Sequence, residues 1–552
     1  MKEQIKKIWG NDKIIFVIIL VIGILFRVIF FDTLPGGINV DEASVGYEAW
    51  SLANYGVDRN LKEYPINLIA WGSGQSATYA YLCIPFIQIL GLTTAAIRMP
   101  NLIIGILALP VMYLVVNALF KNKRVALLSM FMLAVMPWHI MISRWGLDCN
   151  IFPFFFLLGT YFLLIGSKEK PAYLYLSVAV YAFSMYTYAT SYLVLPVFLL
   201  LLIPYLLKIK QIKIKQLILL MLLFIVLIIP IILLVTINML DLKEINIFNI
   251  TIPKYILEET RVESVIKENG GILQNIIELL RVIFMQKDKN THNSIPNVGT
   301  YYYVGFIFFV IGIVLSIKDV KKNQNIWVLF AWLLPAVWLG IISAININRI
   351  NIIWFLINIF ITYGTYYIFN VKGKIWIWIK TAIVIIYIVS ILYFGYLYYI
   401  EKYKQTKNEE ITDYNYIYNI GFKEAVEYVD SIKKEKESIY IYNETIFLYQ
   451  PYIYILFNNP VSPYEFNENV EFYPLKKARE FTVVKRYYNY NFYFENEAEE
   501  IYNENGIHIM DLDTFNYFKR MNTLPKEVIE EKDFGVFKVF RINKEEEIVW
   551  SN

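Results

Sequence analysis

Two short polar stretches of the sequence carry carboxylates beside long apolar runs. In the first, LPGGINVDEASVGYEAW, Asp41 and Glu42 stand side by side after the first apolar run and a Gly-Gly turn. In the second, SRWGLDCN, Asp148 lies between two apolar runs that are only a few residues apart. A carboxylate held at a membrane surface is costly, and general-base catalysis is one use that explains it. We therefore take Asp41, Glu42 and Asp148 as candidate catalytic residues.

Two arginines occupy comparable positions. Arg144 precedes Asp148 in the second stretch, and Arg349, in ININRI, is the only charge between two late apolar runs. A guanidinium offers a fixed fork of donors to phosphate oxygens, so both are candidate phosphate ligands. Simpler explanations stay open at this point. Helix capping and the helix dipole favour acids at a helix start, and an arginine at a membrane surface can merely snorkel.

The composition places these residues in a membrane protein. The chain has 552 residues, of which 57% are hydrophobic and 18% charged, against roughly 25% charged in soluble proteins. A spanning helix needs about 20 apolar residues. Eleven runs reach or approach that length, and the sequence predicts a polytopic helical protein with eleven spans: 14–31, 96–120, 125–142, 151–166, 171–188, 190–207, 216–236, 301–317, 326–346, 351–370 and 375–400.

The charge distribution predicts the orientation. The run 77–91 is short and contains Pro85, which favours an interfacial or re-entrant helix over a span. With that segment left out of the count and the N-terminus inside, Lys and Arg concentrate in the inner loops, and the short outer loops hold only Arg144 and Arg349. This arrangement satisfies the positive-inside rule. If 77–91 did span, the bias would reverse.

The same orientation predicts the domain organisation. Residues 1–400 form the membrane domain, with outer loops at 32–95 and 237–300, and residues 401–552 form a soluble domain on the outer side. That tail alternates helical and strand-like patterns, as a small α/β domain does. It contains no catalytic motif, and a lid or an acceptor-docking module is the simplest interpretation.

Several segments in order resemble the GT-C class of membrane glycosyltransferases. They look like the phospholipid-carrier-dependent branch, which includes the protein O-mannosyltransferases and the lipid A aminoarabinose transferase. The resemblance is tight over about residues 25–165 and looser to 400. It rests on these segments: DEASVGYEAWSLANYGVD, YPINLIAWGSGQSATYAYLCIPFIQILG, IRMPNLIIG and SRWGLD.

The resemblance implies a transferase that uses a polyprenyl-phosphate sugar, of undecaprenyl type in a bacterium, and passes the sugar to a cell-envelope acceptor. By position, Asp41 matches the family's first-loop catalytic acid, with Glu42 beside it. Asp148 matches the acid of the second outer loop, and Arg144 the basic residue before it. Some relatives carry an Arg after the acidic pair and a Lys-Pro later in the loop, where this chain has Ala43-Ser44 and Tyr64-Pro65.

Other classes of protein and of cofactor are less well supported. The net charge of +4 and the lack of a basic patch with interleaved aromatics argue against nucleic acid. We expect no organic cofactor and no resident metal, although Asp41, Glu42 and Asp148 offer the oxygen ligands of a divalent ion. Two rival functions stay open. A polysaccharide polymerase or ligase would rely on arginines in late loops, and a transporter or flippase would place ionisable residues within its spans.

Overall fold

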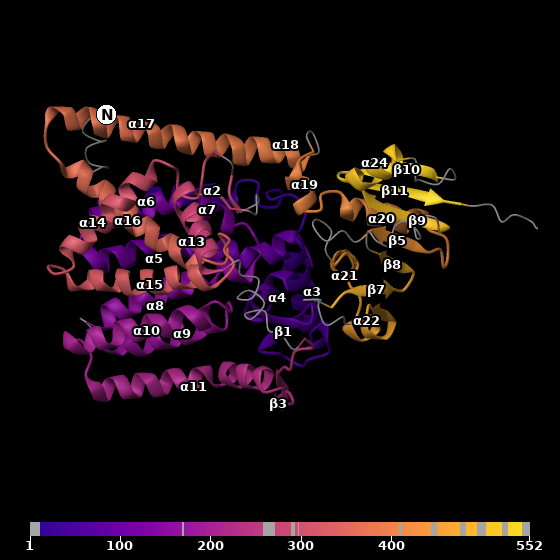
Figure 1. The fold of residues 1–552 in the computed structure, drawn as a ribbon, viewed down its shortest axis with the longest axis horizontal. Coiled ribbons are helices and arrows are strands. Elements are labelled where there is room, and N and C mark those ends of the chain that lie inside the picture. The colour runs from indigo at the N-terminus through magenta and orange to yellow at the C-terminus, as the bar shows by residue number, and fades with distance from the viewer. Residues whose placement is uncertain are drawn as a thin grey trace, which may run out of the picture.

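The computed structural model describes residues 11–167, 170–257, 271–288, 293–295, 297–407, 411–442, 450–474, 482–493, 504–521 and 528–543. Figure 1 shows two parts: a body of long, roughly parallel helices, and a sheet with its own short helices at one end of that body. The first loop of the chain lies between the two parts.

Each of the eleven apolar runs forms a helix. A break at Pro137, which cannot donate a backbone hydrogen bond, divides the third run into α6 and α7. The helices are α2 (Asp12–Val28), α5 (Thr94–Phe120), α6 (Lys123–Val135), α7 (Pro137–Ile142), α8 (Phe152–Gly166), α9 (Ala172–Met185), α10 (Ser191–Lys208), α11 (Ile214–Met239), α14 (Gly305–Asp319), α15 (Trp327–Ile342), α16 (Trp354–Asn370) and α17 (Lys374–Tyr396).

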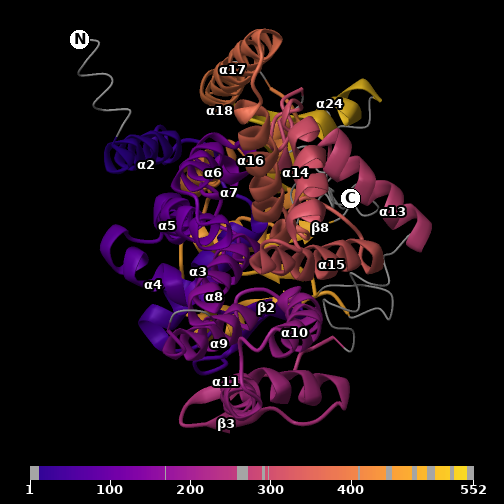
Figure 2. The ribbon, with the colours of Figure 1, turned by 90° about the vertical axis from the view of Figure 1, so that its left-hand side faces the viewer.

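Seven helical segments in the described parts of the chain are long and apolar enough to cross a membrane. The segment that contains α16 has 72% of its most apolar window buried within the protein, whereas the segment that contains α17 has 11% buried. In Figures 1 and 2, α17 and α11 lie on opposite sides of the bundle. Their exposed isoleucines, leucines and valines therefore suit contact with lipid rather than water. The protein is a multi-pass membrane protein.

The first loop contains two helices and a hairpin. They are α3 (Val40–Tyr55), β1 (Asn67–Ala70), β2 (Ser73–Ser76) and α4 (Thr78–Leu90). Helix α4 occupies the short run 77–91. Its 13 residues rise only about 20 Å, which is shorter than the roughly 30 Å of a bilayer's hydrocarbon core.

Beyond α11, a small hairpin, β3 (Ile245–Ile247) and β4 (Ile250–Ile252), is followed by α13 (Ile272–Leu280). The backbone of Thr251 in β4 bonds to Glu63 and Ile66 of the first loop, at 3.0 Å in each case. The first loop and the segment beyond α11 are thereby joined.

Helix α17 continues through a π turn (Leu397–Glu401) into α18 (Lys402–Thr406), and α19 (Asp413–Ile417) leads to the sheet. The sheet order is β10-β11-β9-β5-β8-β7-β6, and β5 is parallel to both of its neighbours while the other pairs are antiparallel. The strands are β5 (Ile439–Tyr442), β6 (Val470–Phe472), β7 (Val484–Tyr487), β8 (Tyr490–Tyr493), β9 (Gly506–Asp511), β10 (Val528–Phe534) and β11 (Phe537–Ile542), with helices α20 (Phe422–Ile432), α21 (Tyr452–Asn458), α22 (Pro463–Asn469) and α24 (Leu512–Arg520).

The sheet part packs against α3 through α21. Gly46 of α3 leaves space for the ring of Phe457, because an added Cβ would lie 2.6 Å from that ring. The hydroxyl of Tyr47 donates to the carbonyl of Val461 at 2.8 Å. The apolar core formed here includes residues of the first loop, α5 and the sheet. The C-terminal part is therefore packed against the loop that carries Asp41.

Candidate active site

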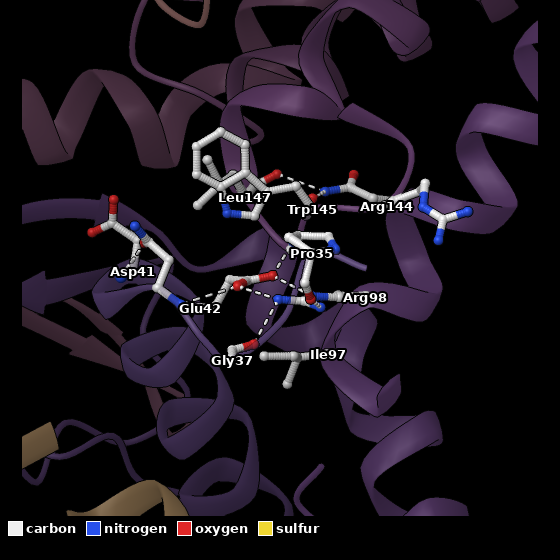
Figure 3. Close-up of polar contacts among 12 residues, drawn as sticks. Pro35, Gly37, Asp41, Glu42, Ile97, Arg98, Arg144, Trp145 and Leu147 are labelled. Carbon is white, nitrogen blue, oxygen red and sulfur yellow. Dashed lines mark hydrogen bonds and ion pairs between the residues drawn. The ribbon is translucent and has the colours of Figure 1, made fainter. Parts of the chain in front are cut away.

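The N-terminus of α3 determines where Asp41 lies. Asn39 caps the helix: its side-chain oxygen accepts from the backbone N–H of Asp41 at 2.8 Å, and Glu42 completes a capping box with the N–H of Asn39 at 3.2 Å. In Figure 3 the carboxylate of Asp41 points away from that of Glu42. The half-buried Asp41 makes no side-chain hydrogen bond or ion pair with the residues that the structure describes. Its carboxylate can therefore accept a proton from a bound molecule.

Glu42 is fully occupied by contacts within the protein. Its carboxylate pairs with Arg98 of α5 at 2.7 and 2.9 Å and accepts from the backbone N–H of Gly146 at 2.8 Å (Figure 3). Arg98 uses its other donors on the carbonyls of Pro35 and Gly37. Both charged side chains have no exposed surface. The geometry therefore gives Glu42 the task of fixing the loops around Asp41 rather than meeting a substrate.

Arg144 points away from Asp41 and Glu42 in Figure 3. Its guanidinium donates to four backbone carbonyls at the end of α2 and just beyond it, at 2.7 to 3.4 Å: those of Phe26, Arg27, Phe30 and Leu34. An arginine satisfies the unpaired carbonyls of a helix C-terminus in this way. The side chain is completely buried. Arg144 is not among the residues that line the cavity with Asp41, and its predicted role as a phosphate ligand stays a prediction.

The side-chain amide of Asn101 holds the second loop in place. The side-chain Nδ2 of Asn101, in α5, donates to the carbonyls of Trp145 and Leu147 at 2.5 and 2.9 Å. Asp148 follows directly, at the first position of a short 3-10 helix (Asp148–Asn150). Asp148 is half-buried and lines the same cavity as Asp41.

Arg349 also lines this cavity and lies in the turn between α15 and α16. Asn346 accepts from its backbone N–H at 2.7 Å, and its own Nη1 donates to the carbonyl of Ala344 at 3.0 Å. Asp288 holds the turn by accepting from the N–H of Ile347 at 2.7 Å. Arg349 is half-buried and lines the cavity.

The cavity has a volume of about 530 Å³ and is lined by both apolar and polar side chains. The apolar wall consists of side chains from three membrane helices, α10, α11 and α15, and these are Leu193, Leu234, Val235, Met239 and Leu339. The polar side chains of the lining include Asn39, Asp41, Asn67, Gln75, Ser76, Asp148, Ser343, Asn346, Asn348 and Arg349. Of the five predicted site residues, the structure brings Asp41, Asp148 and Arg349 to this cavity and places Glu42 and Arg144 in supporting contacts nearby.

Sequence reasoning missed part of the site. In the sequence, Arg98 is only a charged residue near the end of a predicted span, whereas in the structure it forms an ion pair with Glu42. Asn67, Gln75 and Tyr255 line the cavity, and none of them was among the predicted site residues. Gly74, in the segment GSGQS, was a sequence feature that could have pointed to a close contact here. An added Cβ at this position would lie 2.2 Å from the Tyr255 hydroxyl.

The described contacts show which acidic side chains of the site are already engaged within the protein. Among the described residues, no group of three His, Cys, Asp or Glu side chains lies close enough together to hold an ion. Both oxygens of Glu42 are already engaged by Arg98 and by backbone N–H groups. Asp41 and Asp148 remain as acidic groups at the cavity.

The comparisons with known proteins agree with this architecture. Residues 75–234 match the model of the dolichyl-phosphate-mannose-protein mannosyltransferase family. A search of curated proteins found no match. ArnT from Cupriavidus metallidurans in the apo state is similar over 95% of this chain and 96% of its own, with a TM-score of 0.54 and 11% identity. The same protein bound to undecaprenyl phosphate is similar over 95% and 97%, with a TM-score of 0.52 and 10% identity.

These findings confirm two predictions. The resemblance to lipid-carrier-dependent GT-C proteins, drawn from the first-loop and second-loop segments, is confirmed by the family model and by the fold. The fold class is confirmed as a polytopic helical protein with a C-terminal sheet.

Proposed function

We propose that the protein is a glycosyltransferase that moves a sugar from a polyprenyl-phosphate donor to a cell-envelope acceptor. One observation carries the proposal: a single cavity places Asp41, Asp148 and Arg349 beside an apolar wall made by membrane helices. A donor of this class is itself amphipathic, with a hydrocarbon tail, a phosphate and a sugar in series. The match to the mannosyltransferase family model and the fold shared with ArnT support the same class.

The donor phosphate binds at Arg349 in this proposal. The arginine is half-buried at the cavity, in a turn that Asp288 and Asn346 hold in place. Partial burial strengthens a charge-assisted hydrogen bond, and the planar guanidinium can grip two phosphate oxygens at once. The polyprenyl tail lies along the apolar wall of α10, α11 and α15. An undecaprenyl chain is the expected tail in a bacterium.

Asp41 acts as the general base. An acceptor hydroxyl attacks the anomeric carbon, and its proton passes to the Asp41 carboxylate. A bond forms between the acceptor oxygen and the anomeric carbon while the bond from that carbon to the phosphate oxygen breaks. The electron pair leaves with the lipid phosphate, where Arg349 stabilises the negative charge. Asp148 supplies a second carboxylate that orients the acceptor.

The reaction takes place at the outer face of the bacterial cytoplasmic membrane in this account. The cavity is lined by the first loop, next to the sheet part, and α5 leads from there to the basic turn at Lys121 and Lys123. The positive-inside rule puts such a turn in the cytoplasm. Residues 1–400 are then the transferase domain and residues 401–552 an extracytoplasmic domain that covers it.

A binding measurement tests the proposal. Purified protein in nanodiscs is titrated with undecaprenyl phosphate, and Arg349→Ala should bind it at least about 10-fold more weakly, the loss expected for one charged hydrogen bond. Arg124→Ala, an exposed arginine at the start of α6, is the matched control and should bind like the wild type. Equal binding by all three proteins would refute the assignment of this cavity to the lipid phosphate.

A further inference from the structure

Four neutral side chains form a polar ledge on the cavity wall. They are Asn39, Asn67, Gln75 and Tyr255, and we call them the amide ledge. Asn67 and Gln75 come from the paired strands β1 and β2, where Asn67 is opposite Ser76 and Gln75 is opposite Leu68. Side chains alternate between the two faces of a strand, so Asn67 and Gln75 lie on opposite faces of this hairpin, and both residues border the cavity.

Gln75 has hydrogen-bonding capacity that the described protein does not use. The residue is 5% exposed, and its buried Oε1 has no hydrogen-bond partner among the described residues. Its Nε2 makes no hydrogen bond to the described residues either. Burying an unsatisfied amide is costly unless a partner arrives at some stage of the functional cycle.

Asn67 and Tyr255 form an oriented pair. The Tyr255 hydroxyl donates to the Asn67 Oδ1 at 2.9 Å, and burial, followed by the nearby Tyr192, raises the pKa of Tyr255 so that it stays a donor. This bond fixes the amide, so the Nδ2 of Asn67 is left as a donor to the cavity. Gly74 makes the arrangement feasible because a Cβ there would overlap the Tyr255 ring.

The ledge adjoins the apolar wall. Asn238, in the last turn of α11, accepts from the backbone N–H of Tyr255 at 2.8 Å and donates to the carbonyl of Pro253 at 3.1 Å. Leu234 and Met239 of the same helix belong to the apolar wall. Asn39 of the ledge accepts from the backbone N–H of Asp41 at 2.8 Å, and both residues line the cavity. A group held by the ledge therefore lies in the same cavity as the carboxylate that the proposed function puts at the anomeric carbon of the sugar.

We propose that the amide ledge binds the hydroxyl groups of an uncharged donor sugar; this rests on the proposed function and names its substrate class. Amides and a phenol match sugar hydroxyls because each side both donates and accepts. A uronic acid would need a cation of its own. Arg349 is the one Lys or Arg among the described residues of the lining, and the phosphate occupies it.

Lipid binding by two ledge variants tests the inference. The variants Gln75→Ala and Asn67→Ala, with the exposed Gln274→Ala of α13 as control, are titrated in nanodiscs. The probes are undecaprenyl phosphate and its glucosyl, galactosyl, mannosyl and glucuronosyl forms. Wild type and control should bind at least one of the three neutral glycolipids about 10-fold more tightly than undecaprenyl phosphate. Both ledge variants should lose that gain and keep the affinity for undecaprenyl phosphate.

Three results would overturn the inference: no neutral glycolipid bound more tightly by wild type, a gain that survives in both variants, or preference for the glucuronosyl form. Because these variants retain Arg349, unchanged binding of undecaprenyl phosphate also shows that they fold. Failure of wild type to bind undecaprenyl phosphate at all would instead refute the proposed function.

Discussion

The carboxylate of Glu42 accepts a hydrogen bond of 2.8 Å from the backbone N–H of Gly146, which is 104 residues later in the chain. This contact joins the loop that carries Asp41 to the loop that carries Asp148. The same carboxylate pairs with Arg98, so one buried acid fixes three segments relative to one another. The two acidic residues of the first loop therefore have different roles: Glu42 positions the site and Asp41 faces the cavity.

Replacing Glu42 should destabilise the protein, whereas replacing Asp41 should not. In Glu42→Gln the guanidinium of Arg98 stays buried without its counter-charge, which costs about 3–5 kcal/mol. We expect a clearly lower thermal unfolding midpoint in detergent for Glu42→Gln and a midpoint within error of wild type for Asp41→Asn. A wild-type midpoint for Glu42→Gln would show that Glu42 does not hold the loops together.

The two predicted phosphate arginines should respond differently to lysine. Arg144→Lys removes most of the donors that satisfy the carbonyls after α2, so it should lower the unfolding midpoint. Arg349→Lys should leave the midpoint unchanged and raise the dissociation constant for undecaprenyl phosphate by about 10- to 150-fold, the equivalent of 1.5–3 kcal/mol. Titration of the lipid against both variants measures this. If Arg349→Lys titrates like wild type, Arg349 is only a surface anchor.

Asp58 should make stability depend on pH. Burial, followed by the charge of Glu48, raises the pKa of Asp58 to about 7, against about 3.9 when unfolded. Between these two pH values the folded protein holds a proton that the unfolded chain releases. The resulting contribution to the free energy of unfolding is full below about pH 4 and is lost as the pH rises through 7. Thermal unfolding midpoints should be measured from pH 5 to 8. The midpoint of Asp58→Asn should rise relative to that of wild type as the pH increases. A constant difference would mean that Asp58 is ionised throughout.

The membrane orientation predicts where a reporter active only outside the cytoplasm will work. A fusion after residue 408 should be active, and fusions at Lys123 and Lys213 should be inactive, because the positive-inside rule keeps those basic turns in the cytoplasm. Activity at Lys123 would reverse the orientation and place the cavity on the cytoplasmic side.

The helices could be predicted from the sequence because length and apolarity alone define them. The short run 77–91 forms α4, and the break at Pro137 follows from proline chemistry. The partners of the polar residues could not be predicted in the same way. Arg144 and Arg349 look alike in sequence, and only the three-dimensional path of α2 shows that its C-terminal carbonyls surround Arg144.

The amide ledge could not be predicted from the sequence, for a related reason. Asn67 and Gln75 lie in two short strands of the first loop, and Tyr255 lies 188 positions after its partner Asn67. No local pattern reports a contact of that separation. Asp41 was accessible to sequence reasoning because its position at a helix start, directly after an apolar run, is a local feature.

Analysis of cells that lack the protein, complemented with variants, tests the central claim most directly. Lipid extracts and cell-envelope glycans are compared by mass spectrometry after complementation with wild type, Asp41→Asn, or Asp32→Asn, an exposed acid of the same loop. We predict that Asp41→Asn, at wild-type protein levels, accumulates a polyprenyl-phosphate sugar and loses one envelope glycan component by about 100-fold or more, while Asp32→Asn behaves as wild type. Identical lipids and glycans in Asp41→Asn and wild type would contradict the account.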